Sequence, residues 1–177
     1  MENSKNYFKS IIIILSLLGL FLITGIIFLD YHNKISRDQQ RIGDIQKIQI
    51  ALDKFHNKYG HYPDSKADGP CDRWDIGFWQ KNGSDGFINQ LIEETYLEKA
   101  LGDPLFYGDC HQGYFYHRYP CNNNSPVYPC YGSDKPFYIL GIKKLETNKY
   151  KNLNTKFKCP NRDWSQEFDY VIGDWEK

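Results

Sequence analysis

Residues 11–29 read IIIILSLLGLFLITGIIFL, and this stretch decides how the rest of the chain is interpreted. None of its nineteen residues is charged, and Ser16 and Thr24 are its only polar side chains. At about 1.5 Å per residue, a helix of this length spans roughly 28 Å, close to the ~30 Å apolar thickness of a bilayer. Because a helix satisfies its own backbone hydrogen bonds in lipid, the stretch predicts a single transmembrane helix.

Two other interpretations of this stretch are a cleaved secretory signal and the buried helix of a soluble protein. A secretory signal has a shorter apolar core, followed by small residues at its cleavage site. Here the run ends in Phe28-Leu29-Asp30-Tyr31-His32. A buried helix so long and so uniformly apolar is rare in a chain of 177 residues. We therefore expect a retained anchor, with residues 1–10 before it and one water-soluble domain, residues 30–177, after it.

The charge balance of the chain limits its partners. It has 22 Lys and Arg residues against 22 Asp and Glu residues, so its formal net charge is zero. No basic field is available to attract nucleic acid. We therefore expect membrane lipid, and not nucleic acid, as a partner.

All five cysteines, Cys71, Cys110, Cys121, Cys130 and Cys159, follow the apolar stretch. None belongs to a C-x-x-C pair, so the usual zinc spacing is absent. A cysteine-rich polar domain behind one N-terminal span suits an oxidising compartment, with two disulfides and one odd thiol. Cys121 and Cys130 are the favoured pair because they bracket the turn-rich segment NNNSPVYP, and the remaining pairing stays open. The alternative is five free thiols in a reducing compartment.

The cysteines also set the expected orientation of the span. Lys and Arg are equally frequent just before and just after it, so the positive-inside rule does not decide. We expect the N-terminus in the cytoplasm and the C-terminal domain outside it, where disulfides form.

An amphipathic helix is expected directly after the apolar stretch. Its apolar residues follow one another in steps of three, four or seven, which keeps them on one helical face; they are Ile35, Ile42, Ile45, Ile48, Leu52, Phe55 and Tyr59. The polar side chains from Arg37 to Lys54 are expected to fill mostly the other face. Gly60 suits the residue after the helix, and Pro63 prevents its resumption. One helix from about residue 11 to residue 59 is predicted, with the following domain as the cover for its apolar face.

The remaining chain predicts loops, a short helix and a sheet. Residues 61–86 are rich in Gly, Pro, Asp and Ser and read as a long loop. Residues 87–102, FINQLIEETYLEKALG, predict a second helix. The runs YFYHRY, PFYILGI and FDYVIG predict strands of an antiparallel sheet. Because helices precede strands instead of alternating with them, the expected class is α+β, with a long N-terminal helix packed on a small antiparallel sheet.

This order of elements, together with several residues, resembles the type IV pilin-like family, most of all the G-type (major) pseudopilin of type II secretion systems. Asp44-Ile45, Ile48, Ala51-Leu52, Phe55 and Gly60-His61-Tyr62-Pro63 are similar to the family pattern D-I-x-x-I-x-x-A-L-x-x-F/Y … G-x-Y-P at the end of its long helix. The later similarities are Leu91, Tyr96-Leu97 and Asp103-Pro104 to its L … Y-L … D-P segment, and Tyr114-Phe115-Tyr116 and Tyr138-Ile139-Leu140 to its first two strands. The resemblance covers residues 11 to about 142. It implies a subunit of a secretion or pilus-type assembly in a bacterial inner (plasma) membrane, with a periplasmic or extracellular domain that associates with itself or with other pilin-like subunits.

The chain departs from this family at its processing motif. Family precursors have Gly just before the apolar run and Glu five residues into it, whereas this chain has Ser10 and Leu15 there. A Glu in lipid is costly, and the family's Glu pairs with a neighbouring N-terminus during assembly. Leu15 cannot form that pair.

The resemblance also bears on calcium. G-type members often hold calcium in a loop between late strands, but the corresponding stretch CNNNSPVYPCYGSD has one carboxylate, Asp134. Because calcium needs several hard oxygen ligands, the spacing does not support a site, and a Cys121–Cys130 bridge in place of the ion is the hypothesis. We expect no cofactor.

We expect no enzyme, because the sequence lacks H-E-x-x-H, G-x-S-x-G, P-loop and G-x-G-x-x-G motifs. Two functions of different class remain. The first is a structural, membrane-anchored pilin-like subunit; its helix-packing residues would be Gly19, Gly25, Ile42, Ile45, Leu52 and Phe55, with the glycines allowing close approach in lipid. The second is a stand-alone anchored binding module on a pilin-like fold; its binding surface would be Trp74, Trp79, Tyr128 and Tyr131. The divergent processing positions favour the second function, and the helix pattern fits both.

Overall fold

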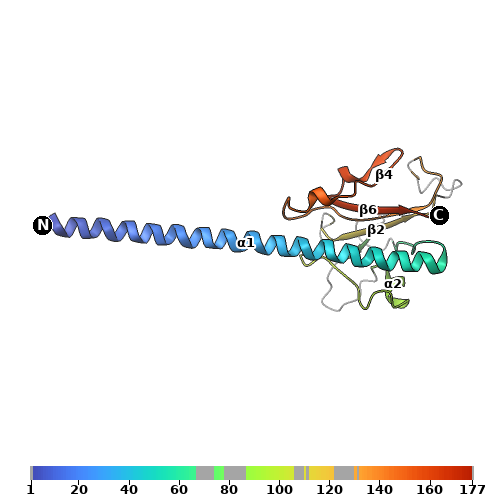
Figure 1. The fold of residues 1–177 in the computed structure, drawn as a ribbon, viewed down its shortest axis with the longest axis horizontal. Helices are drawn as coiled ribbons and strands as arrows, with labels where there is room; N and C mark the ends of the chain where they lie inside the picture. Colours follow the sequence, from blue (N-terminus) through green and yellow to red (C-terminus); the bar gives the residue numbers. More distant parts are fainter. Residues whose placement is uncertain are drawn as a thin grey trace. The chain divides into compact units, whose positions relative to one another are not determined.

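The computed structural model describes residues 2–66, 74–77, 87–105, 110, 112–121, 130 and 132–176, and for residues 2–10 only the backbone. The chain divides into two compact units, Met1–Ser36 and Arg37–Lys177. Helix α1 (Glu2–Tyr59) begins in the first unit and ends in the second (Figure 1). The prediction of one helix through both the apolar and the amphipathic stretch is confirmed.

The second unit is built around a four-stranded antiparallel sheet with the strand order β1-β2-β3-β6. Its strands are β1 (Asp75–Gly77), β2 (Tyr114–Tyr119), β3 (Phe137–Ile142) and β6 (Tyr170–Trp175). Together with α1 this gives the predicted α+β class. The three expected runs form β2, β3 and β6, whereas β1 lies in a segment that the sequence predicts to be a loop. Its three residues are too short to show an alternating pattern.

Smaller elements complete the second unit. Helix α2 (Asn89–Glu93) precedes β2, and the 3-10 helix η1 (Lys151–Leu153) follows β3. Strands β4 (Lys158–Cys159) and β5 (Arg162–Asp163) form a separate two-stranded sheet, and the 3-10 helix η2 (Trp164–Gln166) follows it. None of these elements is long enough to show a periodic pattern of apolar residues in the sequence.

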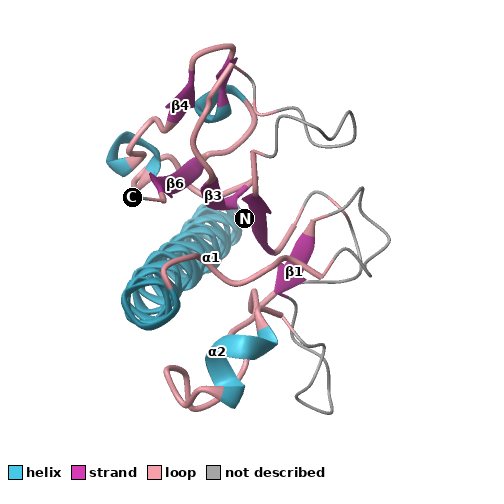
Figure 2. Cartoon of the chain, turned by 90° about the vertical axis from the view of Figure 1, so that its right-hand side faces the viewer, coloured by secondary structure: helices cyan, strands magenta, loops and turns pink. Residues whose placement is uncertain are grey.

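The sheet is buried on both faces. Tyr114 of β2, Ile142 of β3 and Tyr170 of β6 pair side by side across the sheet. They belong to the first hydrophobic cluster, which packs against α1. Their neighbours Phe115 and Val171 belong to a second cluster, with Trp164 and Cys159 from the β4–β5 region. Figure 2 shows the strands β3 and β6 between α1 and β4. The alternation of the strands therefore fills two cores, one on each side of the sheet.

The C-terminal part of α1 supplies the apolar face expected of it. Ile45, Ile48 and Leu52 are fully buried, and Ile42 and Phe55 are 6% exposed. The sheet of the same chain covers this face, as predicted. The prediction that charged residues fill the opposite face is wrong for Asp38, Arg41 and Asp44, which are all buried.

The end of α1 follows the predicted stop signal. Gly60 has φ +75°, a left-handed conformation that glycine adopts without a Cβ clash, and its N–H donates to the His56 carbonyl at 2.8 Å. Tyr62 then folds back and stacks on His56, with ring centroids 4.6 Å apart. Its ring also lies edge-on to Tyr138 of β3. The exit from the helix is thereby fastened to the sheet.

The second predicted helix is much shorter than residues 87–102. Helix α2 ends at Glu93 because Thr95 adopts a left-handed conformation (φ 58°) and the N–H of Tyr96 donates to the Leu91 carbonyl at 2.8 Å. The chain beyond this point leaves the helical path, and Tyr96, Leu97 and Leu101 pack against the first hydrophobic cluster. Tertiary packing thus overrides a helical pattern that the sequence carries to residue 102.

Strand β6 lies at one edge of the sheet, and side chains from the preceding loop bind its backbone. Thr155 donates its hydroxyl to the Val171 carbonyl at 2.6 Å. The Asn154 amide donates to the carbonyls of Phe168 and Asp169 at 3.1 and 3.2 Å, and its oxygen accepts from the Val171 N–H at 3.4 Å. These polar groups occupy backbone positions that another strand would otherwise pair with.

Candidate functional site

The first unit presents an apolar surface along α1. Every large apolar side chain of residues 11–29 is more than half exposed, from 51% for Ile12 to 75% for Phe21. Leaving such side chains in water forgoes about 1.5–3 kcal/mol each. By length and composition this helix could cross a membrane, and a bilayer would remove that cost.

The two hydroxyls of the apolar stretch bond within their own helix. Ser16 donates to the Ile13 carbonyl at 2.9 Å, and Thr24 donates to Leu20 and Phe21 at 3.1 and 2.9 Å. In lipid an unpaired hydroxyl is costly, and these intrahelical bonds remove that cost. The surface therefore presents no unpaired hydroxyl between residues 11 and 29.

A buried ion cluster joins α1 to two loops of the second unit. The Arg41 guanidinium binds both carboxylate oxygens of Asp103, at 2.7 and 2.9 Å, and also donates to Asp38 at 2.8 Å and Glu146 at 2.9 Å. Arg37 makes a bidentate pair with Glu146, with both bonds at 2.7 Å. The planar guanidinium fork matches a carboxylate in this geometry, which makes such pairs strong and directional.

Burial and pairing act in opposite directions on the pKa values in this cluster. Burial alone would lower the pKa of Arg41, but its bonds to Asp103, Glu146 and Asp38 raise that pKa above its ordinary value. Burial alone would raise the pKa of Glu146, but hydrogen bonds from Arg37 and Arg41 lower it. Pairing wins in both groups, so the charged forms are the stable ones.

Asp38 ties the same cluster to the chain after β3. Its carboxylate accepts from the backbone N–H groups of Glu146 and Thr147 at 3.0 and 2.8 Å, and from the Thr147 hydroxyl at 2.8 Å. Asp44, one turn beyond Arg41, accepts from the Tyr114 hydroxyl at 3.0 Å. The helix is therefore pinned to its domain by polar contacts on the side that faces the sheet.

Sequence reasoning missed this cluster, although a signal for it exists. Asp38 and Arg41 precede Ile45, Ile48 and Leu52 in steps of three and four, so they continue the buried stripe of the helix. Because both residues are charged, the sequence-based prediction placed them on the solvent-exposed face of the helix. Spacing decides the face here, and the charges are satisfied by partners far away in the sequence.

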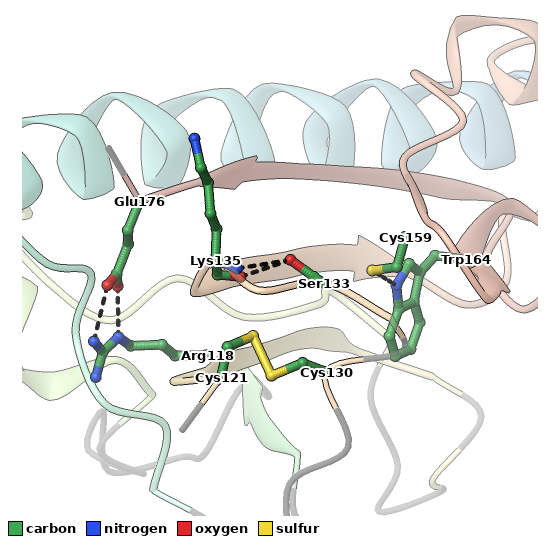
Figure 3. Close-up of a disulfide and its surroundings, with 8 residues drawn as sticks. All are labelled: Arg118, Cys121, Cys130, Ser133, Lys135, Cys159, Trp164 and Glu176. Atoms are coloured by element: carbon green, nitrogen blue, oxygen red, sulfur yellow. Dashed lines mark hydrogen bonds and ion pairs between the residues drawn. A yellow bond between two sulfur atoms is a disulfide. The ribbon is translucent and has the colours of Figure 1, made fainter. Parts of the chain in front are cut away.

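A second ion cluster holds Glu176, directly after β6, near the exit of α1. Arg118 binds both carboxylate oxygens of Glu176, at 2.7 and 3.0 Å (Figure 3), and donates to Asp64 at 2.6 Å. The Glu176 carboxylate also accepts from the Tyr62 N–H at 2.9 Å. Both ends of the second unit are thus held by arginine–carboxylate pairs.

The cysteines bear out the expected pairing as far as the structure describes them. Cys121 and Cys130 form a disulfide with Cα atoms 5.2 Å apart (Figure 3). Cys110 is disulfide-bonded as well. Cys159 is a free thiol, buried and in contact with the Trp164 indole, whose N–H donates to its sulfur at 3.2 Å. Burial raises the pKa of this thiol. Cys71 lies outside the described residues.

The aromatic residues expected to form a binding surface are placed only in part. Trp74 is half-buried and lies edge-on to the rings of Phe115, His117, Trp164 and Phe168, with centroids 5.4–6.0 Å apart. It therefore packs with the second hydrophobic cluster. Trp79, Tyr128 and Tyr131 lie outside the described residues.

The helix-packing residues divide between the two units. Ile42, Ile45, Leu52 and Phe55 pack inside the second unit, so their side chains are not available to a neighbouring subunit. Gly19 and Gly25 lie in the apolar stretch, and a Cβ added to either would meet nothing within 4 Å.

In the part of the chain that the structure describes, no group of three or more His, Cys, Asp or Glu side chains is arranged to hold a metal ion. Comparisons with protein-family models, with curated proteins and with solved structures find no match.

Proposed function

We infer that the chain is a single-span membrane protein with a structural role in a pilin- or pseudopilin-like assembly. The observation that carries this proposal is the exposed, uncharged stretch of residues 11–29, on a helix whose later turns form the core of an α+β unit. An anchor and a folded domain that share one helix suit a subunit held at the membrane surface.

The order of the elements supports the pilin-like part of the proposal. A long N-terminal helix, a Gly-x-Tyr-Pro exit at residues 60–63, a short helix and then the strands β2, β3 and β6 follow one another as the sequence resemblance implies, and the short strand β1 precedes the helix. The Asp103-Pro104 pair of that resemblance lies at the buried ion cluster, where Asp103 binds Arg41 of the long helix. Asp103, a residue of the family-like motif, therefore helps to hold the long helix against the rest of the second unit.

The disulfides support the expected orientation. Cys121–Cys130 and the bond of Cys110 both belong to the second unit, and disulfides persist in oxidising compartments. The second unit then lies on the periplasmic or outer side of a bacterial inner membrane, and residues 1–10 lie in the cytoplasm.

Contacts between subunits would fall to the apolar stretch. Because Ile42, Ile45 and Leu52 are covered by the chain's own sheet, the side chains open to a neighbour in the membrane are those of residues 11–29. Gly19 and Gly25 permit close helix approach there. Van der Waals packing at such small residues is the main source of helix association in lipid.

Cysteine crosslinking in intact membranes tests the proposal. Single cysteines replace Gly19 or Phe21, which lie about 200° apart around the helix, in a Cys159→Ser background. We expect an oxidant to produce dimers or larger species strongly from Gly19→Cys and weakly from Phe21→Cys. Two differently tagged copies of the chain show whether the product joins like subunits.

Two results would contradict the proposal. Alkaline carbonate extraction that released the protein from membranes would refute the anchor. Purely monomeric protein from both cysteine positions, combined with no product from a photo-crosslinking residue at Ile50, would refute the assembly. Ile50 is included as a position outside the span. Its side chain is 57% exposed on the same helix and is therefore accessible to a neighbouring subunit.

A further inference from the structure

A groove of about 360 Å³ lies beside the end of β6 in the second unit. It is lined by Gly132, Ser133, Asp134, Lys135, Pro160 and Trp175. Its volume falls within the range of about 300–1,000 Å³ that is usual for small-molecule sites. Neither the pilin-like role nor the predicted aromatic surface uses these residues.

Trp175 provides a fixed aromatic ring at this groove. It is half-buried, and its indole packs against Phe137 and Phe157 with centroids 4.9 and 5.4 Å apart. Those two rings fix the position of the indole on the side of the sheet away from α1. Within the described chain, no hydrogen bond from its indole N–H is present. The groove therefore offers both an apolar ring and a donor.

Two adjacent charged side chains supply the polar part of the groove. Asp134 and Lys135 are exposed, and among the described residues neither the carboxylate nor the ammonium group is bonded to a partner. The Ser133 hydroxyl, by contrast, is occupied: it donates to the Lys135 carbonyl at 2.9 Å and accepts from the Lys135 N–H at 3.0 Å (Figure 3). Acceptors and donors thus stand unpaired beside one aromatic ring.

Contacts within the chain hold the walls of the groove in place. The Cys121–Cys130 disulfide anchors the start of the loop, and the Ser133 N–H donates back to the Cys130 carbonyl at 2.8 Å. Gly132 has φ +85°, and a Cβ there would come within 2.7 Å of the Asn161 amide. The loop therefore packs closely against the turn between β4 and β5. Such preorganisation lowers the entropy that binding costs.

We propose that this groove binds a saccharide unit. The C–H face of a sugar ring is apolar and fits against a fixed indole, while its hydroxyls both donate and accept hydrogen bonds. Asp134 accepts from hydroxyls, and Lys135 and the Trp175 indole donate to them. A purely apolar ligand would leave the Asp134 carboxylate desolvated and unpaired. The adjacent charges of Asp134 and Lys135 cancel, so the groove has no net positive charge to attract a phosphate-rich ligand.

This inference does not rest on the proposed assembly. The groove lies in the second unit, while the assembly contacts lie at residues 11–29. Each proposal therefore succeeds or fails on its own experiment.

An array of immobilised oligosaccharides, followed by titration of each bound sugar, tests the proposal. The full-length protein is used in a polyoxyethylene detergent, because maltoside and glucoside detergents carry sugar headgroups that would compete. We expect binding of at least one saccharide. A hydrogen bond to a charged group and a buried aromatic contact are each worth more than a tenfold change in affinity. We therefore expect Trp175→Ala and Asp134→Asn each to weaken binding by about tenfold or more.

Matched variants separate binding from folding. Glu98→Gln and Lys144→Gln change exposed charges elsewhere in the second unit, and we expect both to bind as the parent does. Trp175→Phe keeps an aromatic ring beside Phe137 and serves as a second variant if Trp175→Ala does not fold; its affinity should fall less than that of Asp134→Asn. Binding that is unchanged in Asp134→Asn, or the absence of binding to every saccharide on the array, would overturn the proposal.

Discussion

Replacing Arg41 by Met tests whether the buried ion cluster holds α1 on its domain. Methionine replaces the aliphatic part of the arginine side chain, but it removes four hydrogen bonds. Two of these bonds go to Asp103, one goes to Asp38 and one goes to Glu146. The perturbation therefore leaves three carboxylates without their central cation.

The cost falls unequally on these carboxylates. Asp38 keeps three donors from Glu146 and Thr147, and Glu146 keeps Arg37. Asp103 is 1% exposed, and among the described residues its carboxylate keeps only the Leu105 N–H as a donor, at 2.8 Å. Stranding one buried charge in this way typically costs about 3–5 kcal/mol of unfolding free energy. For a unit of this size, that loss corresponds to a fall in melting temperature of about 10–17 °C.

The assay is denaturant unfolding of the full chain in detergent, followed by tryptophan fluorescence from the second unit. The double variant Arg41→Met/Asp103→Asn removes the stranded charge, and its amide oxygen can still accept from Leu105. We expect it to recover about 1.5 kcal/mol or more relative to the sum of the two single variants.

Arg37→Met is the matched control: its side chain is 27% exposed, Glu146 keeps Arg41, and we expect a cost of about 1 kcal/mol or less. A cost below about 1 kcal/mol for Arg41→Met, or no recovery in the double variant, would refute the reasoning.

Further predictions concern pH, thiols, the disulfide and glycines. Hydrogen bonds from the two arginines lower the pKa of Glu146. Its stabilising contribution should therefore be complete above its unfolded pKa of about 4.3 and be lost as pH falls through the lower folded value. Denaturant titrations from about pH 7 to pH 3 should show a smaller loss of stability in Glu146→Gln than in the parent, and the same pH profile in both proteins would contradict this. Alkylation should leave native Cys159 unlabelled and label it after unfolding without reductant, while Cys121 and Cys130 stay protected, as mass spectrometry of the peptides will show. Replacing Cys121 and Cys130 together by Ala opens a loop with a sequence separation of 9 and should lower the unfolding free energy by about 2.5 kcal/mol in the same denaturant assay. Gly43→Ala, with nothing within 4 Å of the new Cβ, should raise the melting temperature because it stabilises α1 by about 1 kcal/mol, whereas Gly173→Ala should lower it because its Cβ would lie 2.6 Å from the Tyr138 carbonyl.

Long periodic patterns and special backbone positions were predictable from the sequence. The apolar stretch, the buried stripe from Ile42 to Phe55 and the stop at Gly60 depend on local spacing or on one residue's conformational freedom. The strands β2, β3 and β6 carry dense aromatic and β-branched residues. The Cys121–Cys130 pair followed from a turn-rich segment short enough to bring its ends together.

Features that depend on distant partners were not predictable. The spacing of Arg41 indicates the buried face of the helix, but nothing near it in the sequence identifies its partners Asp103 and Glu146, which reach it from two separate loops. Thr95 ends α2 in a conformation that a β-branched residue seldom adopts, because the residues after it pack against the core. The groove at Trp175 joins two segments that only the fold of the sheet brings together.

The hydrogen bonds from Asn154 and Thr155 bear on how copies of this chain can meet. An uncovered β6 would invite another chain to extend the sheet, the route by which many β proteins aggregate or polymerise. Here the Val171 carbonyl and N–H are already occupied by side chains of the same molecule. Growth by strand addition is disfavoured at this end of β6, whereas the exposed apolar stretch of residues 11–29 stays open to a second copy of the chain.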